Sequence, residues 1–130
     1  MARVRSIAIV GLSPKPHRDS NRIGRYLIEH GYEVFAVYPR EASILGRPVF
    51  RRVQDIPGGV DLVDVFRRSE ELGAVTDDAI AAKAKALWFQ LDCVDEASAS
   101  RAQSAGLTVV MDRCIMVDHA GLLGRQSRRN

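Results

Sequence analysis

Short apolar runs alternate along the chain with longer stretches in which apolar residues recur every three or four positions. The apolar runs predict five strands, over residues 6–12, 33–38, 62–66, 86–90 and 107–111. The helical spacing predicts helices from Asp19 or Ser20 to about His30, from Ser69 to Lys83 and from Asp95 to Ala105. This alternation is typical of a mostly parallel sheet covered on both faces. We therefore predict an α/β, Rossmann-like three-layer domain with a five-stranded parallel sheet in the order 3-2-1-4-5.

Two stretches have a weaker pattern. Residues 40–52 follow no clear period, and a short hairpin around Gly46 is one interpretation of them. Residues 53–56 predict a short helical turn before a Pro-Gly-Gly signal, and residues 118–123 predict a last short helix. Because no linker, repeat or low-complexity segment interrupts the pattern, we expect one domain over residues 1–124.

The net charge of the chain is concentrated at its carboxyl end. The formal net charge is +3, but Arg125, Arg128 and Arg129 fall within the last six residues, which contain no acid. Without these three arginines the chain carries 16 basic and 16 acidic residues. A neutral body lacks the basic face that general nucleic-acid binding needs. We therefore expect no nucleic-acid partner, and a basic disordered tail over residues 125–130.

The apolar and cysteine content argues against further classes. No apolar run approaches the roughly 20 residues of a membrane-spanning helix, and the run from Ile7 to Leu12 is too short for a secretory signal. Cys93 and Cys114 lack CxxC spacing and the histidines are not clustered, so we expect no metal site. Reduced thiols and the lack of a membrane segment favour a cytoplasmic protein.

The loop after the first predicted strand has the composition of an anion site. It reads Gly-Leu-Ser-Pro-Lys-Pro-His-Arg-Asp-Ser from Gly11 to Ser20. The helix that follows presents unpaired backbone N–H groups and the positive end of its dipole. Gly11 permits a close approach of a ligand, while Ser13 and Ser20 can donate hydrogen bonds to it. Lys15 and Arg18 add positive charge, so we favour phosphate binding over the alternative, a solvated loop stiffened by prolines.

The same loop lacks the two common nucleotide motifs. No second glycine follows Gly11 before Gly24, which excludes G-x-G-x-x-G, and no G-K-[ST] follows, which excludes a P-loop. The second strand ends in Tyr38-Pro39-Arg40, where NAD-binding folds carry an acidic residue for the ribose. An arginine there suits a ribose phosphate, as in NADP or the 3′-phosphate of coenzyme A. A solvated arginine that begins a loop is the alternative.

Ligands of such sheets bind outside the carboxyl ends of the strands, where the strand order reverses. In the predicted order this switch point lies between the first and fourth strands. The strand-end segments that can contact a ligand, besides the first loop, are Tyr38-Pro39-Arg40, Phe66-Arg67, Gln90-Leu91-Asp92 and Asp112-Arg113-Cys114. Gln90, the last residue of its strand, can contact a ligand or satisfy backbone groups of its own loop.

Taken in order, these segments resemble the small stand-alone CoA-binding domain family, which is similar to the N-terminal domain of the succinyl-CoA synthetase alpha subunit. The matching segments are Ile7 to Pro16 with Arg18-Asp19-Ser20, Gly31-Tyr32, Val37 to Arg40, Ile44 to Gly46, Asp55 to Pro57, Val63 to Arg67, Trp88 to Gln90, Ala105 to Cys114, and Asp118-His119. The resemblance implies a Rossmann-like fold with coenzyme A or an acyl-CoA as ligand. It also implies that the first loop holds the diphosphate and that the end of strand two faces the adenosine end.

The sequence and the resemblance together favour a binding or regulatory module rather than an enzyme. The residues expected to bind the cofactor are Gly11, Ser13, Lys15, Arg18, Ser20, Pro39, Arg40, Phe66, Arg67 and Gln90. We assign no catalytic residue, because Cys114 and His119 lie five positions apart without a motif that brings them into contact. An NADP-binding oxidoreductase domain is the alternative, although no Tyr-x-x-x-Lys pair is visible. The sequence specifies no protein partner.

Overall fold

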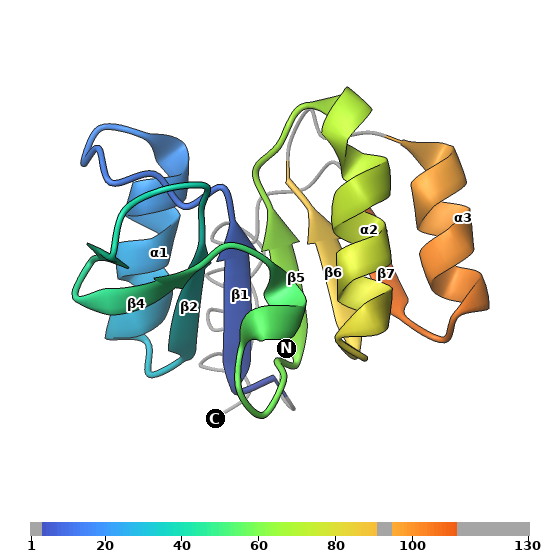
Figure 1. Cartoon of the computed structure of the whole chain (residues 1–130), viewed down its shortest axis with the longest axis horizontal. Helices are drawn as coiled ribbons and strands as arrows, with labels where there is room; N and C mark the ends of the chain where they lie inside the picture. The colour runs from blue at the N-terminus through green and yellow to red at the C-terminus, as the bar shows by residue number, and fades with distance from the viewer. Residues whose placement is uncertain (1–3, 91–94, 112–130) are drawn as a thin grey trace, which may run out of the picture.

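The computed structural model describes residues 4–90 and 95–111 (Figure 1). The strands in this part are β1 (Ser6–Val10), β2 (Glu33–Val37), β3 (Ser43–Ile44), β4 (Arg47–Phe50), β5 (Leu62–Val65), β6 (Ala86–Phe89) and β7 (Thr108–Met111). The helices are α1 (Asp19–Glu29), α2 (Leu72–Ala81) and α3 (Glu96–Ser104), with the 3-10 turns η1 (Val53–Asp55) and η2 (Ser69–Glu71). The strands and long helices predicted within these residues are all present, and their bounds differ by at most three residues.

All seven strands join one sheet, in the order β3-β4-β2-β1-β5-β6-β7. Each neighbouring pair is parallel except β3 and β4, which form an antiparallel hairpin around Gly46. The hairpin suggested for residues 40–52 is therefore confirmed. The α/β, Rossmann-like class with a mostly parallel sheet is confirmed as well.

The predicted strand order 3-2-1-4-5 is wrong. The third predicted strand, β5, pairs with β1 and does not lie outside β2. The place beside β2 belongs to β4, whose Val49 and Phe50 pair with that strand. The sequence pattern did not place β4 in the main sheet, because a four-residue strand that contains Pro48 shows no clear alternation. With β4 on that edge of β2, the next long strand pairs with the open side of β1.

Apolar side chains pack on both faces of the sheet, and consecutive strand residues point to opposite faces. On one face α1 contributes Ile23 and Leu27. On the other face α2, α3 and η1 cover the strands, as Figure 1 shows. In β2, β5 and β6 the even-numbered apolar residues face α1 and the odd-numbered ones face α2. This parity decides which strand-end side chains can meet on one side of the sheet.

The bounds of α1 follow from its sequence. Ile23 and Leu27 lie one turn apart and are buried against the sheet, so burial of this apolar stripe stabilises the helix. The helix ends at Glu29, and two residues later Gly31 has φ +88° and donates its N–H to the Ile28 carbonyl. Tyr32 then donates its N–H to the Leu27 carbonyl, as in a glycine-based helix C-cap. The helix therefore begins directly after the predicted phosphate loop and runs along one face of the sheet.

Several sequence predictions concern residues outside the described ranges. They are those for Leu91, Asp92, Cys93, Asp112, Arg113, Cys114, His119, the helix over 118–123 and the tail over 125–130. Within residues 4–90 and 95–111, no helix is long and apolar enough to cross a membrane. The same residues hold no group of three His, Cys, Asp or Glu side chains suited to a metal ion.

Candidate functional site

The observed strand order places the switch point between β1 and β5. From β1 the sheet grows through β2 to the β3–β4 hairpin on one side, and through β5 to β7 on the other. The predicted order had put the strand ending in Gln90 beside β1. The structure instead brings Phe66, which follows β5, to the end of β1. The carboxyl ends of β1, β2 and β5 therefore form the floor of the candidate site.

Gly11 lies where these three strand ends meet. Its N–H donates to the Val37 carbonyl at 2.8 Å, and the Phe66 N–H donates to the Val10 carbonyl at 2.8 Å. Gly11 has φ +90°, which L side chains rarely adopt, and a Cβ at this position would lie 2.2 Å from the Phe66 carbonyl oxygen. Only glycine fits here, because any side chain would push β1 and β5 apart.

The loop from Gly11 to Ser20 is ordered by hydrogen bonds around Ser13. The Ser13 N–H donates to the Ser20 hydroxyl at 2.9 Å, and the Asn21 side-chain amide donates to the Ser13 carbonyl at 2.8 Å. The Lys15 N–H donates to the Ser13 hydroxyl at 3.1 Å. Ser20 and Asn21 are both buried, whereas Lys15 reaches the surface. The loop is thus held from below by the first turn of α1, and its outer side stays open to a ligand.

The first turn of α1 faces the same space. Arg18 is the N-cap residue of the helix, and no side chain caps this end. The Arg22 N–H is bonded to the Arg18 carbonyl at 3.1 Å, so the N–H groups before it precede the helical ladder. Arg25 donates to the Pro16 carbonyl at 3.1 Å and ties the loop to the helix. Backbone N–H groups and the helix dipole therefore favour an anion at this position.

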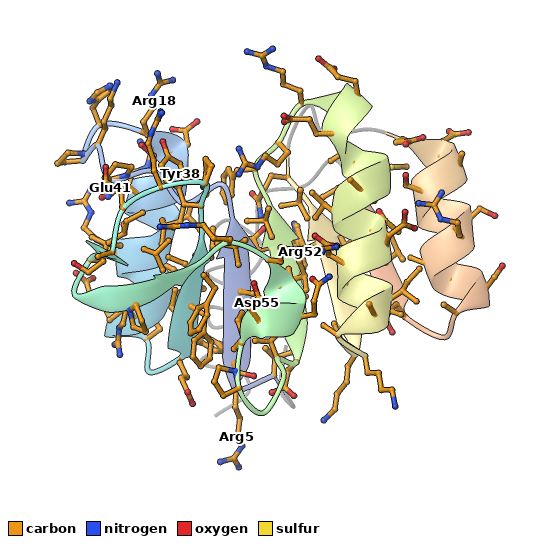
Figure 2. All side chains as sticks on the ribbon, viewed as in Figure 1. Arg5, Arg18, Tyr38, Glu41, Arg52 and Asp55 are labelled. Atoms are coloured by element: carbon orange, nitrogen blue, oxygen red, sulfur yellow. The ribbon has the colours of Figure 1, made fainter. Side chains whose placement is uncertain are left out.

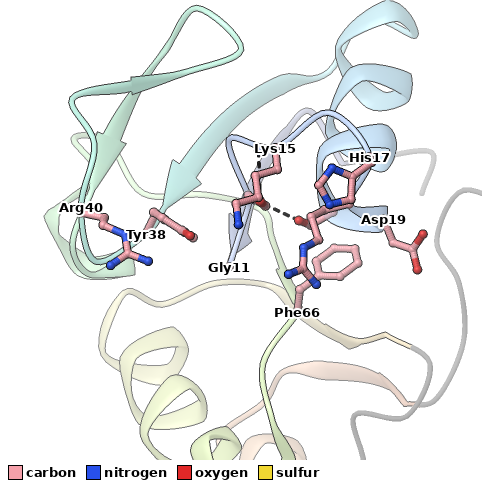
Figure 3. A pocket seen from close by; sticks show the side chains of 10 residues that line it. Gly11, Lys15, His17, Asp19, Tyr38, Arg40 and Phe66 are labelled. Carbon is pink, nitrogen blue, oxygen red and sulfur yellow. Dashed lines mark hydrogen bonds between the residues drawn. The ribbon is translucent and has the colours of Figure 1, made fainter.

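A cavity of about 620 Å³ opens above the loop (Figure 3). Its lining residues are Gly11, Ser13, Lys15, His17, Arg18, Asp19, Ser20, Tyr38, Arg40 and Phe66. In Figure 3, Tyr38 and Arg40 lie on one side, His17 and Phe66 on the other, and Lys15 between them. The structure therefore brings together seven of the ten residues that the sequence assigned to cofactor binding.

The positive side chains around this cavity have no acidic partner in the described part of the chain. Lys15, Arg18 and Arg40 form no ion pair there, and the Arg40 guanidinium lies 5.8 Å from the centre of the Tyr38 ring. Among the described residues that line the cavity the one acid is Asp19, which is paired with Arg22 at 2.8 Å. Figure 2 shows Arg18 and Tyr38 at the same end of the molecule. The cavity therefore carries a net positive field that suits a phosphorylated ligand.

Pro39 and Arg67, two further predicted residues, lie on the opposite face of the sheet. They line a second cavity of about 510 Å³, together with Val10, Val37 and Val53. Parity explains the separation, because Tyr38 and Phe66 continue the register that faces α1 while Pro39 and Arg67 continue the other. The two cavities adjoin the same strand ends from the two sides of the sheet.

Gln90, the tenth predicted residue, lines neither cavity. It is buried, and its side-chain amide donates a hydrogen bond to the Asp64 carboxylate in the middle of β5. Asp64 is fully buried, and its Oδ2 has no hydrogen-bond partner among residues 4–90 and 95–111. Burial raises the pKa of the Asp64 carboxyl to about 7, and the Gln90 hydrogen bond offsets only part of that rise. The side chain of Gln90 thus bonds to a buried carboxylate in the core and does not face either cavity.

Sequence reasoning left three lining residues out of the cofactor set, namely His17, Asp19 and Tyr38. For Tyr38 a signal existed, because residues two apart in a strand share a face and Val34 and Ala36 carry the pattern that faces α1. His17 and Asp19 belong to the loop that was predicted to bind phosphate. Their position on the cavity wall depends on the loop conformation, which the pattern of residues does not specify.

Comparison with known proteins assigns the chain to a family. A model of the CoA binding domain matches residues 5–120. The chain belongs to the CoA-binding domain family. The resemblance drawn from the sequence is therefore confirmed, and the phosphate loop, the first cavity and the strand ends around it all lie within the matched residues.

This CoA-binding domain also has individual relatives. It is 37% identical to "Uncharacterized protein YneT" of Bacillus subtilis (strain 168) over 120 residues, which are 92% of this chain and 89% of that protein. A hypothetical protein from Pyrococcus horikoshii OT3 has a similar structure, with a TM-score of 0.91 and 40% identity over 94% of this chain and 86% of that one. The domain also covers 25% of the dinucleotide-forming acetyl-coenzyme A synthetase 1 of Ca. Korarchaeum cryptofilum, with 80% of this chain matched, a TM-score of 0.72 and 26% identity.

Proposed function

We propose that this CoA-binding domain binds coenzyme A or an acyl-CoA through the loop between β1 and α1, as a non-catalytic binding or regulatory module. The observation that carries the proposal is the positive cavity of about 620 Å³ at the switch point, in a chain of the CoA-binding domain family. Part of an acetyl-coenzyme A synthetase has the same fold, which supports a ligand of this class.

The diphosphate of the ligand belongs on the loop from Gly11 to Ser20. Unpaired N–H groups at the start of α1 can donate to its oxygens, and the Ser20 hydroxyl can donate its own hydrogen while it accepts one from Ser13. Lys15 and Arg18 border the same space without acidic partners in the described residues. Charge-assisted hydrogen bonds from such groups are stronger than neutral ones.

The adenosine end of the ligand belongs at the end of β2. Arg40 can pair with the 3′-phosphate of coenzyme A, because its guanidinium is planar and offers two parallel donors. Pro39 and Arg67 line the adjoining cavity on the other face, so a ligand that contacts them as well must extend across the strand ends. Phe66, the residue before Arg67, lines the first cavity and offers an apolar surface to the ligand.

The module itself is proposed to bind and not to catalyse. The first cavity is lined by cations, hydroxyls, the His17 imidazole, and one tyrosine and one phenylalanine ring, and its carboxylate, Asp19, is paired with Arg22. This set suits recognition of phosphate and ribose. A regulatory role predicts a protein partner whose binding changes with the ligand. A pull-down with and without coenzyme A tests this role, and a partner that appears in both conditions equally contradicts it. The cytoplasmic location expected from the sequence stays a prediction.

Titration calorimetry of the full chain with coenzyme A, dephospho-CoA and NADP tests the proposed ligand. We expect coenzyme A to bind most tightly and dephospho-CoA, which lacks the 3′-phosphate, to bind about tenfold more weakly, or about 1.4 kcal/mol. Absence of binding to coenzyme A would overturn the proposal. Tighter binding of NADP, with hydride transfer to a carbonyl substrate, would favour the oxidoreductase alternative. The mass of any small molecule that copurifies with the protein gives an independent check.

A further inference from the structure

Arg51 lies just after β4 and lines the second cavity, yet its guanidinium is bonded to the loop beside the first. One nitrogen of this side chain, Nη1, lies 3.1 Å from the Tyr38 carbonyl oxygen. The same nitrogen lies 3.0 Å from the carbonyl oxygens of Arg40 and Glu41. Three of the four carbonyl groups from residue 38 to residue 41, all but that of Pro39, therefore share one cationic donor.

The backbone of this loop requires such support. Glu41 has φ +73°, a left-handed conformation that costs a non-glycine residue about 1–2 kcal/mol. Strained residues of this kind persist where their surroundings hold them. The adjoining strand pairing contributes two further bonds, from the Tyr38 N–H to the Phe50 carbonyl at 3.0 Å and from the Val49 N–H to the Ala42 carbonyl at 3.2 Å. Along the chain between these two bonds, the turn itself is held by the hydrogen bonds from Arg51.

On its other side the same loop presents Tyr38 and Arg40 to the first cavity. In the described residues the Arg40 guanidinium has no ion pair, and its one recorded neighbour is the Tyr38 ring at 5.8 Å. Both side chains leave the backbone at residues whose carbonyl groups Arg51 binds. Within the described residues no hydrogen bond or ion pair fixes the Arg40 side chain, so the path of the loop sets where that side chain leaves the backbone.

We propose that Arg51 is a positioning residue that sets the selectivity of the cavity for a ligand with a phosphate on its ribose. It acts through the backbone of residues 38–41, which aim the Arg40 guanidinium at that phosphate. This inference rests on the proposed function, since it presumes that the adenosine end of coenzyme A lies at the end of β2. Arg51 does not line the first cavity, so its role there follows only from its bonds to the loop.

Arg52 provides a matched control, because it is adjacent to Arg51 and has the same charge. Its guanidinium is bonded to Asp78 of α2 at 2.8 Å and does not bond the loop. Figure 2 shows Arg52 beside α2, away from Tyr38 and Glu41. Arg51→Met and Arg52→Met therefore remove the same charge. The first variant loses three hydrogen bonds to carbonyl groups of the turn, whereas the second loses one ion pair with Asp78 and leaves the turn intact.

The experiment measures Kd for coenzyme A and dephospho-CoA, in the full chain at low ionic strength, for wild type, R51M, R52M and R40A. The wild-type ratio of the two Kd values is expected to be about ten, and R40A should lower it to about one. We expect R51M to lower the ratio to about two or less, while its Kd for dephospho-CoA changes less than about threefold. R52M should keep the wild-type ratio.

Two further variants separate positioning from a general loss of structure. The double variant R40A/R51M should have the same ratio as R40A, because the two residues act on the same contact. Arg51→Lys keeps a cation near the three carbonyl groups and should restore part of the ratio. A thermal melt of each variant shows whether R51M loses more stability than R52M.

The outcomes distinguish this inference from the function on which it rests. If the wild-type chain binds no coenzyme A, the proposed function fails and the inference fails with it. If the wild type discriminates between the ligands, R40A does not, and R51M still does, only the role of Arg51 is overturned. An equal weakening of both ligands in R51M, with an unchanged ratio, would also overturn it.

Discussion

Two loops border the candidate cavity, and they are held in place in different ways. The phosphate loop, residues 11–20, is fixed by short buried side chains of the helix that follows it, Ser20 and Asn21. The second loop, residues 38–42, is called the adenosine loop for its proposed role, and it is fixed by the long side chain of Arg51, which belongs to the connection beyond the β3–β4 hairpin. The first loop is supported from the chain immediately after it, and the second from the segment that follows β4.

The difference suits the two parts of the ligand that the two loops are proposed to bind. In the proposed complex a diphosphate binds mainly to backbone N–H groups, and a rigid loop keeps these donors aimed at little entropic cost. The same proposal places a ribose phosphate against the side chain of Arg40, so its recognition would depend on where the second loop directs that side chain. Damage to the phosphate loop should therefore affect every nucleotide ligand, whereas damage to the adenosine loop should affect the choice between ligands.

The largest effect is expected at Gly11, where both loops depend on the same strand ends. Gly11→Ala places a Cβ 2.2 Å from the Phe66 carbonyl oxygen at φ +90°. We expect the free energy of unfolding to fall by roughly 2–5 kcal/mol, from left-handed strain and overpacking together, with loss of coenzyme A binding. Chemical denaturation and calorimetry measure the two effects.

Gly31→Ala is the matched control for this substitution. Gly31 has nearly the same φ, +88°, but no atom lies within 4 Å of the position of an added Cβ. The Gly31 variant should therefore lose only the free energy of unfolding that the left-handed backbone strain costs, roughly 1–2 kcal/mol, and it should bind coenzyme A normally. Equal losses in the two variants would show that the close approach to Phe66 is unimportant.

The second prediction concerns Asp64, which is buried in β5 opposite Ile9 of β1 and belongs to neither loop. Burial raises the pKa of its carboxyl from 3.8 to about 7, so the folded chain keeps a proton that the unfolded chain releases. Between about pH 4 and pH 7 the stability of the wild type should therefore fall as the pH rises, and above pH 7 this contribution should level off.

Asp64→Asn removes this titration and keeps an oxygen that can accept from Gln90. The stability of the variant relative to the wild type should rise by as much as about 4 kcal/mol from pH 4 to pH 8, at 1.36 kcal/mol per pKa unit. Denaturation at several pH values measures this difference in the free energy of unfolding. A cost of the substitution that is the same at every pH cancels when the values at pH 4 and pH 8 are compared. The ratio of Kd values for coenzyme A and dephospho-CoA should stay unchanged. A stability difference that is flat with pH would contradict the raised pKa.

The third prediction separates the two loops directly. Asn21→Ala removes the amide that donates to the Ser13 carbonyl and leaves that acceptor without its partner. Stability should fall by roughly 1–3 kcal/mol, and coenzyme A and dephospho-CoA should weaken by the same factor, because both contain the diphosphate. A change in the ratio of the Kd values for coenzyme A and dephospho-CoA would contradict this prediction. It would mean that Asn21 affects ligand selectivity in the way expected of Arg51, so the two loops would not differ.

The smallest effect on the fold is expected at Lys15, which reaches the cavity from the surface of the phosphate loop. Lys15→Ala should weaken binding of both ligands by roughly 1–3 kcal/mol if the ammonium group bonds to phosphate, and should leave the melting temperature unchanged. Lys83→Ala, which changes an exposed lysine that lines neither cavity, is the control. Unchanged affinity of the Lys15 variant would place that side chain in solvent.

The elements of this fold were largely predictable because their signals are local. Ile23 and Leu27 mark the inner face of α1, and Gly31 marks its end within one further turn. The composition of the loop from Gly11 to Ser20 likewise pointed to a phosphate site, and the structure lines one cavity with its residues. Signals of this kind depend on neighbours within about one helical turn or one strand.

The strand neighbours and the sides of the sheet were not predictable in the same way. The weak pattern of residues 40–52 gave no sign that β4 pairs with β2, and the strand order was wrong as a result. The strand parity was readable, but Pro39 and Arg67 were still grouped with residues on the other face. Gln90 was expected to contact a ligand, whereas its amide bonds to Asp64, a residue 26 positions earlier in the chain.

By itself, the sequence determined that this chain is a Rossmann-like α/β domain of strands and amphipathic helices, with a phosphate-type loop after its first strand. These properties follow from periodicity and from turn residues, which act over short distances along the chain. The tertiary structure alone decided that β5 lies beside β1 and that Arg51 supports the loop carrying Arg40. Such contacts depend on which strand edges remain open when the sheet assembles, and that is a property of the whole fold.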